Sequence, residues 1–227
     1  MLRLRKAKLS NGIQNTSIAT HTWGGHALKD KASGKYVGFF SYMAGHCTLS
    51  SWQGNSMIIS AVSDTPDGPY NQAMKPVTAP WTHNAMISHH PNGSYFLFHI
   101  GTGRPKQAYK PCSTTPDPFF PNGAFPPGHP EPPAATTHVS ESLDGPWRAA
   151  PGVPGVNNPA VYFFENGTTL IFDRTAMKWA PSIDGPWLHA NQKSTVVVNG
   201  SMRPEDPFVW KDKRGFHMLF NANSDHS

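Results

Sequence analysis

The stretch that decides the fold is a four-residue turn that occurs three times, as Asp67-Gly68-Pro69-Tyr70, Asp144-Gly145-Pro146-Trp147 and Asp184-Gly185-Pro186-Trp187. In each copy the Asp-Gly pair favours a tight turn, and proline can open the next strand because it needs no N–H donor there. The aromatic residue is expected to pack against a neighbouring sheet. Three copies of one turn predict an architecture built from a repeated structural unit.

Three predicted strands precede each turn, because short apolar or alternating segments are typical of buried and half-buried strands. They cover residues 25–29, 36–43 and 56–63 in the first unit, 84–89, 94–100 and 136–142 in the second, followed by 146–149, and 159–164, 168–173 and 177–181 in the third. A fourth unit begins with residues 206–210 and 215–221. The pattern predicts an all-β fold, a β-propeller of four-stranded antiparallel blades, with about three and a half blades in this chain.

An open arc of blades would leave an unpaired sheet edge, which closed propellers avoid. We therefore expect the chain to be a fragment of a longer propeller, the preferred reading, or to close by self-association, for example by strand exchange with a second copy. Residues 1–19 are predicted to form a basic N-terminal tail. Residues 20–227 are predicted to form the propeller domain, incomplete at its C-terminal end.

The composition supports this class of fold. The 227 residues include 20 glycines and 23 prolines, and only 15% are charged, which favours short strands and tight turns. No apolar run approaches the roughly 20 residues of a membrane span, so no membrane partner is expected. The net charge of +5 is concentrated in the tail, and no nucleic-acid recognition motif accompanies it. We expect no nucleic-acid partner.

The cysteines and glycosylation sequons indicate a compartment. Cys47 and Cys112 are the two cysteines, and either a disulfide between them or two free thiols fits the sequence. A disulfide together with sequons suggests a secreted protein, yet residues 1–10 contain no apolar signal-peptide core. A removed signal, an incomplete gene model and chance sequons remain alternatives. The four Asn-X-Ser/Thr sequons begin at Asn15, Asn92, Asn166 and Asn199.

One segment has no periodic pattern. Residues 103–135 hold 10 of the 23 prolines, and we interpret them as a solvent-exposed insertion between two strands of the second unit. The alternative is a loop that shapes a binding cleft, because this connection lies on the same face of the propeller as the starts of the first strands. Both cysteines are predicted to lie on that face.

Polar residues collect on the same face. In an antiparallel blade, the start of the first strand and the end of the second share one side, and the first strand lies nearest the axis. A convergent polar pocket is therefore predicted there. Trp23, Trp52 and Trp81 could add stacking surfaces for sugar rings, although each is more often a core residue. The polar candidates are His26, His83, Asn84, Asn157, Asn158, Glu205 and Asp206 from first strands, and His46, His99, Asp173, Arg174 and Asn221 from second strands.

These segments resemble a known family. The matching stretches are residues 21–27, 79–84, 157–160 and 203–210, together with the three turns, so they span most of residues 20–221. They are similar to the five-bladed glycoside hydrolase family 43-like propellers, the arabinanase/levansucrase/invertase superfamily, and especially to its eukaryotic members. The resemblance implies a five-bladed plan and a carbohydrate substrate or ligand.

The resemblance also implies a chemistry. In that superfamily carboxylates at the starts of the first strands cut glycosidic bonds, which requires two carboxyl groups about 5–9.5 Å apart. Asp206 matches such a position and Glu205 precedes it, whereas the first blade offers His26 where those enzymes carry Asp. Asn84 and Asn158 occupy the second and third blades, and neutral amides do not exchange protons at useful pKa values. The alternatives for the second catalytic group are Asp173, a histidine that acts as the acid (His26 or His83), and a glutamate from a missing blade.

The leading hypothesis is a glycoside hydrolase acting on an oligosaccharide or polysaccharide. Non-catalytic carbohydrate binding and a protein-interaction scaffold are the alternatives. No cofactor is expected. His26, His83 and Asp206 could bind a divalent ion at the propeller axis, but these residues do not have the spacing that is diagnostic of a metal site. The catalytic candidates are Asp206, Glu205, Asp173 and His26. The substrate-binding candidates are Trp23, His83, Asn84, His99, Asn158, Arg174 and Arg203. The two arginines could bind an anionic substrate group or form a structural ion pair.

Overall fold

A computed structural model describes residues 21–104, 108–125, 134–150, 152–173, 177–189 and 203–223, without the side chains of residues 122, 203, 204, 222 and 223. The predicted basic tail, residues 1–19, lies outside the described residues, as do the sequons at Asn15 and Asn199. Within the described part, no helix is long and apolar enough to cross a membrane.

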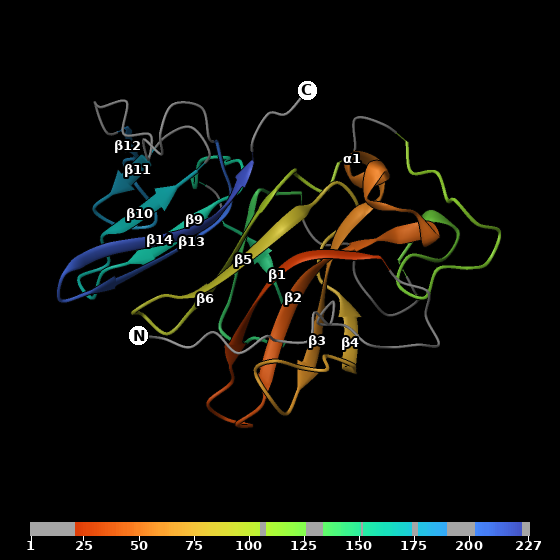
Figure 1. Ribbon diagram of the computed structural model, residues 1–227, viewed down its shortest axis with the longest axis horizontal. Helices are drawn as coiled ribbons and strands as arrows, with labels where there is room; N and C mark the ends of the chain where they lie inside the picture. Colours follow the sequence, from red (N-terminus) through yellow and green to blue (C-terminus); the bar gives the residue numbers. More distant parts are fainter. Residues whose placement is uncertain are drawn as a thin grey trace.

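The described chain is almost entirely β-structure, arranged in three four-stranded sheets and one strand pair, all antiparallel (Figure 1). The short helical turns are η1 (Ala44–His46), η2 (Leu49–Ser51), α1 (Trp52–Asn55) and η3 (Pro121–Gly123). The sheets are β1 (Thr22–Lys29), β2 (Tyr36–Met43), β3 (Ser56–Ser63) and β4 (Gln72–Pro76); β5 (His83–His89), β6 (Tyr95–Ile100), β7 (Thr137–Ser140) and β8 (Arg148–Ala149); β9 (Ala160–Phe163), β10 (Thr169–Phe172), β11 (Met177–Ala180) and β12 (Leu188–His189); and β13 (Arg203–Asp212) with β14 (Gly215–Asn223).

The first strands of successive sheets lie side by side. Strand β1 contacts β5, β5 contacts β9, and β9 contacts β13, so these four strands surround a common axis. This is the arrangement of a β-propeller with three complete blades and the first two strands of a fourth. The prediction of an all-β fold with about three and a half blades is confirmed.

Each repeated turn joins the third and fourth strands of one blade. The Gly-Pro peptide is cis in all three copies, and the preceding glycine has φ of 85°, 88° and 92°, a left-handed conformation that glycine adopts without strain. Trp147 of blade 2 meets Phe39 of blade 1 edge-on, with ring centroids 5.5 Å apart. Trp187 of blade 3 joins the apolar cluster between blades 2 and 3. These two tryptophans thus pack towards the preceding blade, as expected from the sequence, whereas Tyr70 of the first turn packs against Phe40 of its own blade.

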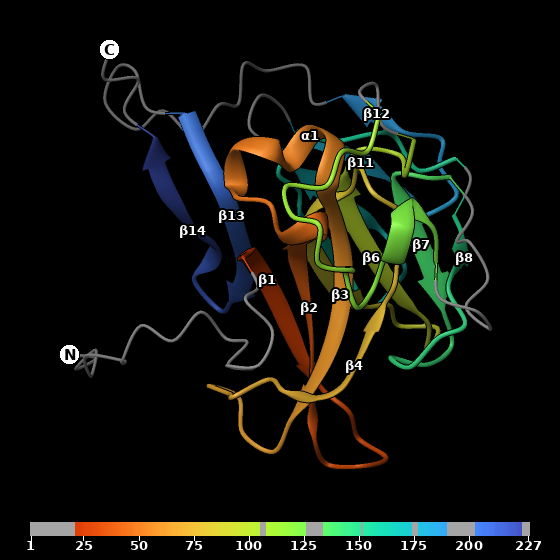
Figure 2. The same cartoon turned by 90° about the vertical axis from the view of Figure 1, so that its right-hand side faces the viewer.

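The insertion covers the side of blade 1 that faces away from blade 2. Phe39 and Ile58 point towards blade 2, whereas alternate residues such as Phe40 and Ile59 point the other way. On that second face lie Phe119 and Phe120 of the insertion, buried in one cluster with the blade 1 side chains. Figure 2 shows the insertion, in green, running past β3. These two phenylalanines are therefore part of the core, and the expectation of a merely exposed loop is wrong for them, whereas residues 110–112 and 114–116 of the insertion are exposed.

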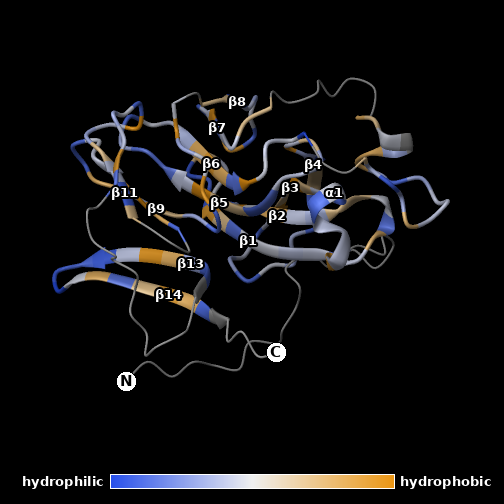
Figure 3. Ribbon diagram, turned by 90° about the horizontal axis from the view of Figure 1, so that it is seen from above, coloured by the Kyte–Doolittle hydropathy of each residue, from blue (hydrophilic) through white to orange (hydrophobic). Residues whose placement is uncertain are grey.

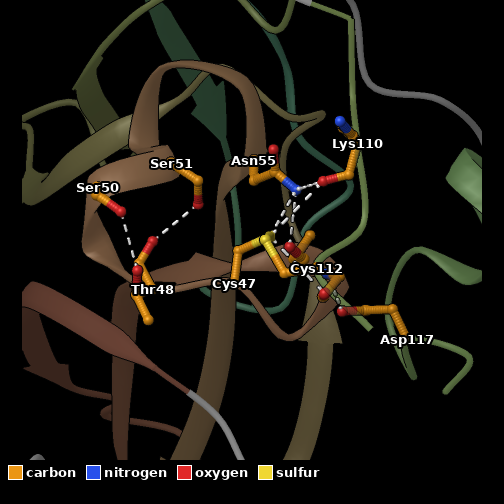
Figure 4. The surroundings of a disulfide bond; sticks show 10 residues. Cys47, Thr48, Ser50, Ser51, Asn55, Lys110, Cys112 and Asp117 are labelled. Carbon is orange, nitrogen blue, oxygen red and sulfur yellow. Dashed lines mark hydrogen bonds between the residues drawn. A yellow bond between two sulfur atoms is a disulfide. The ribbon is translucent and has the colours of Figure 1, made fainter. Parts of the chain in front are cut away.

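Two links hold the insertion to blade 1, one a disulfide and the other a set of hydrogen bonds to a buried carboxylate (Figure 4). Cys47 and Cys112 form a disulfide with 5.0 Å between their Cα atoms, which resolves the choice between a disulfide and free thiols. The buried Asp117 carboxylate accepts hydrogen bonds from the Tyr42 hydroxyl and from the Gly45 N–H, both at 2.6 Å. Its other oxygen accepts from the backbone N–H groups of Phe119 and Phe120, at 2.8 and 2.9 Å.

The half-blade is covered on one side. Phe216 of β14 packs edge-on against Tyr162 of blade 3, with ring centroids 5.1 Å apart. On the opposite side Trp210 stacks with His217, and the neighbouring Leu219 is 68% exposed. Figure 3 shows hydrophobic residues along both strands of this pair. Self-association through this face remains a prediction.

The links between the insertion and blade 1 can be tested through Asp117. Replacing Asp117 with Ala leaves a buried hydroxyl and several buried N–H groups without their acceptor, so we expect the free energy of unfolding to fall by roughly 3–5 kcal/mol. Chemical denaturation measures this change. Asp64→Ala is the control, because that carboxylate is largely exposed and its ion pair with Lys35 is screened by water. Equal effects of the two substitutions would contradict the anchoring role.

Candidate functional site

The residues nearest the propeller axis share one unusual backbone conformation. Gly24, Asn84, Asn158 and Asp206 have φ of 53°, 54°, 51° and 49°. On β1, β5 and β13 the strand register shifts at this point, as at a β-bulge. Left-handed φ values are tolerated best by Gly, Asn and Asp, because a larger or branched side chain clashes with its own backbone. The backbone therefore restricts which residue types can occupy these four equivalent positions.

This equivalence corrects the assignment of His26. The counterpart of Asp206 in blade 1 is Gly24, so blade 1 contributes no side chain there. His26 lies two residues further along β1 and corresponds to Phe208, whose ring it contacts with centroids 5.4 Å apart. Burial holds the pKa of His26 below its usual value, and its Nδ1 has no hydrogen-bond partner among the described residues. At neutral pH His26 is thus a neutral side chain against the axis.

Asn84 connects three blades across the axis. Its Nδ2 donates to Asn158 Oδ1 and to Asp206 Oδ1, each at 2.7 Å. The other Asp206 oxygen accepts from Asn221 Nδ2 at 3.4 Å. Hydrogen bonds to a carboxylate are among the stronger ones and suit its ionised form. Asn84, Asn158 and Asp206, three of the predicted residues, are therefore brought together, and they line a cavity of about 100 Å³ with Gly24 and His26.

A second and larger pocket opens next to this cavity. Its volume is about 310 Å³, and it lies between the loops of blade 1 and the starts of β5 and β13. Trp23 is 41% exposed in its wall, and Trp52 stacks on Trp81 with ring centroids 5.3 Å apart. Flat aromatic surfaces and polar groups thus face one space. The lining consists of Trp23, Leu49, Trp52, His83, Asn84, Ile100, Asn157, Asn158 and Glu205.

We call these two neighbouring spaces the funnel, defined by the lining residues of the 100 Å³ and 310 Å³ pockets. Among the described residues that line it, Glu205 and Asp206 are the acidic ones. No residue of the described insertion lines it; Tyr109, Cys112 and Asp117 line a separate pocket instead. The alternative that the insertion, residues 103–135, shapes the cleft thus gains no support from its described residues and stays a prediction.

His83 is a neutral polar group in the wall of the funnel. Its Nδ1 and the Ser56 hydroxyl are 2.7 Å apart, and the Trp52 ring lies against its imidazole at 5.1 Å. Burial lowers the pKa of His83 to about 4. At neutral pH the ring can exchange hydrogen bonds with a ligand hydroxyl but has no proton to supply as an acid. The histidine alternative for a catalytic acid therefore loses support for both His83 and His26.

Two predicted site residues lie away from the funnel. His99 is fully buried, its Nε2 lies 3.0 Å from His138 Nδ1, and burial lowers its pKa to about 3. A side chain with no exposed surface cannot contact a substrate, so this prediction is wrong. The Asp173 carboxylate is 6% exposed and pairs with Lys178 at 3.4 Å, and it lines neither space of the funnel. Its role as a second carboxylate is therefore unsupported.

The remaining predictions are only partly covered. Arg174 lies outside the described residues, and Arg203 is described only as the first residue of β13, without its side chain. In the described part of the chain, no three His, Cys, Asp or Glu side chains assemble into a group that could hold a metal ion. The expectation of no cofactor stays a prediction.

Comparisons with known proteins identify the type of fold. Solved structures similar to this chain include a family 117 glycoside hydrolase, Zg3597, from Zobellia galactanivorans (TM-score 0.59, 13% identity, covering 100% of this chain and 68% of that one). Others are a protein of unknown function from Dyadobacter fermentans (0.55, 12%, 91% and 64%) and a GH43_1 enzyme from Xanthomonas citri (0.50, 16%, 87% and 63%). The chain has a glycoside hydrolase-like propeller fold.

At these identities the likeness shows the fold and does not select one glycoside hydrolase family. The chain spans about half to two thirds of the length of the solved structures it matches. No protein-family model and no curated protein sequence matches it. The expected five-bladed, family 43-like assignment is thus supported at the level of the propeller fold.

The buried histidines predict a pH dependence of stability. In the unfolded chain His83 and His99 titrate near their usual pKa of about 6.5, but in the folded protein burial lowers these values to about 4 and about 3. The unfolded state therefore binds more protons, and the free energy of unfolding should fall as pH drops from about 6.5 towards 4. Denaturation curves at several pH values measure this fall.

A histidine substitution isolates one contribution. His83→Gln removes a titrating group while retaining an amide for Ser56, so its stability should decrease less steeply between pH ~6.5 and ~4 than that of the unmodified protein. His189→Gln is the matched control at an exposed position. A slope that His83→Gln leaves unchanged would contradict a neutral, buried His83.

Proposed function

We propose that the funnel binds an oligosaccharide or polysaccharide chain and hydrolyses it as a glycoside hydrolase, with Asp206 as the principal catalytic carboxylate. The observation that carries this proposal is the placement of Glu205 and Asp206, both in the lining of the funnel and next to a tryptophan-containing wall. The glycoside hydrolases among the similar folds support the same class of chemistry.

The two acidic residues suit different parts of the reaction. Asp206 accepts hydrogen bonds from Asn84 and Asn221, which favour the ionised carboxylate that a base or nucleophile requires. Glu205 lines the larger space, where a sugar chain would enter, and is the described residue best placed to protonate the leaving oxygen. Hydrolysis adds water across the glycosidic bond, with its proton going to the departing sugar and its hydroxyl to the anomeric carbon.

Binding rests on the neutral residues of the funnel. Trp23 and Trp52 offer ring faces to the apolar side of a sugar, and His83, Asn84 and Asn158 offer hydrogen bonds to its hydroxyls. Since His83 is neutral above a pKa of about 4, these contacts should not change between weakly acidic and neutral pH. This pattern is typical of a site for an uncharged ligand.

A second candidate function is carbohydrate binding without hydrolysis. Three of the four equivalent positions at the axis, Gly24, Asn84 and Asn158, carry no carboxylate. A site with this composition can hold a glycan and still lack proton transfer. Tight binding of intact glycans, with no product after prolonged incubation, would favour this function over the enzyme.

Asp206→Asn tests the catalytic proposal. Asparagine tolerates the left-handed φ of 49° at this position, so the fold and glycan binding should be retained. Turnover on a panel of glycans should fall by at least about a hundredfold, because the amide cannot act as base or nucleophile. Glu165→Gln, in an exposed turn, is the matched control and should remain fully active. Undiminished turnover in Asp206→Asn would remove Asp206 from the chemistry.

Trp23→Ala tests the binding surface. Losing one stacking face should weaken glycan binding by roughly tenfold, equivalent to about 1.4 kcal/mol, in isothermal titration. Trp210→Ala is a matched control, because Trp210 is 42% exposed against 41% for Trp23 but lies outside the funnel. If both substitutions weaken binding equally, the funnel is not the glycan site.

A further inference from the structure

Two of the sequons lie in structurally equivalent turns. The sequon at Asn92 is in the turn between β5 and β6, and the sequon at Asn166 is in the turn between β9 and β10. Each turn is closed by the same backbone hydrogen bonds: His90 N–H to Ser94 O at 2.8 Å and Phe164 N–H to Thr168 O at 2.8 Å. The first two strands of blades 2 and 3 are thus joined by the same five-residue turn.

The asparagine side chains have the same conformation in both turns. The Oδ1 atom of Asn92 accepts the N–H of Ser94 at 3.0 Å, and that of Asn166 accepts the N–H of Thr168 at 3.1 Å. The Nδ2 atom, where a glycan is attached, donates to none of the described residues in either turn. The amide is therefore oriented by its oxygen while its nitrogen faces outward.

Both turns have room for a large attached group. Asn92 and Asn166 are exposed. A Cβ atom added to the following residue, Gly93 or Gly167, would meet no atom within 4 Å. The turns lie at the end of the blades opposite to α1 and the funnel; in Figure 1 the β5–β6 turn is at the lower left and α1 at the upper right. A glycan on either turn would leave the funnel open.

We propose that Asn92 and Asn166 are N-glycosylation sites, with a polyprenyl diphosphate-linked oligosaccharide as the donor. The asparagine Nδ2 forms a bond to the anomeric carbon of the first sugar, the bond from that carbon to the diphosphate oxygen breaks, and the amide loses one proton. Polyprenyl diphosphate leaves. The Cys47–Cys112 disulfide is consistent with passage through the oxidising compartment where such donors act.

The fold constrains when the transfer occurs. The hydroxyl of Ser94, which belongs to the Asn92 sequon, is buried and donates to the Glu141 carboxylate at 3.0 Å. An enzyme that must recognise this hydroxyl can reach it only before β6 pairs with β7. The transfer at Asn92 therefore precedes the completion of blade 2, and the finished turn then presents the glycan outward.

The test maps the two sites in the full chain. The chain is secreted from a eukaryotic cell line behind a cleavable leader, and the glycans are removed with an amidase that converts each modified Asn to Asp. Peptide mass spectrometry should then find Asp at positions 92 and 166. If the secreted, disulfide-bonded chain carries a glycan at neither turn, or at only one, the inference is overturned.

Matched variants assign the modification to the sequons. Asn92→Asp and Asn166→Asp keep the acceptor oxygen of the turn and should each remove one glycan, which is read as a loss of one glycan mass from the intact secreted chain before amidase treatment. Thr168→Val should abolish modification at Asn166 while keeping the shape of the side chain, whereas Thr168→Ser should retain it. A glycan that persists at Asn166 in Thr168→Val would contradict the assignment. None of these positions lies in the funnel, so the outcome is independent of the proposed hydrolase activity.

Discussion

Each blade of this propeller has two apolar faces, and the need to bury both of them governs the rest of the structure. Phe39 and Ile58 on one face of blade 1 are buried against blade 2, and Met86 and Phe98 of blade 2 are buried against blade 3. A large apolar side chain buried in this way contributes about 1.5–3 kcal/mol. Cores between successive sheets therefore position the first strands around one axis, and that arrangement creates the funnel.

Blade 1 satisfies the same requirement in a different way. Its second face is covered by Phe119 and Phe120, which come from the loop between β6 and β7 rather than from the strands of another sheet. The loop can do this because a disulfide and the buried Asp117 carboxylate fix it at two points. A segment without regular strands thus performs the packing role of a sheet.

The sequence predicted most of the fold because local patterns determine it. The Asp-Gly-Pro-aromatic turns located the junction between the third and fourth strands of each blade, and strand periodicity located β2, β3, β5 and β6 closely. Phe119 and Phe120 could not be recognised as core residues, since they lie in a proline-rich segment with no periodicity. Their partners are far away in the sequence, so only the tertiary structure reveals the contact.

The site was predicted less completely. Asp206, Asn84 and Asn158 were identified because each begins a first strand, but in blade 1 the equivalent position is Gly24, which has no side chain, and His26 lies two residues further along β1. A Gly-Gly pair at this place, Gly24-Gly25, was the available signal. His99 was misplaced because a strand end does not by itself indicate which face a side chain occupies, and in β6 this side chain turns towards His138.

The left-handed backbone at the axis also bears on how such a site can change during evolution. Only Gly, Asn and Asp fit these positions without strain, and single-base changes convert Asn to Asp and Asp to Gly. A lineage with this fold can therefore exchange an amide for a carboxylate, or remove the side chain altogether, while the propeller stays intact. Changes among these three residue types at Gly24, Asn84, Asn158 and Asp206 therefore need no change in the local backbone, so funnels with different sets of carboxylates are close neighbours in sequence space.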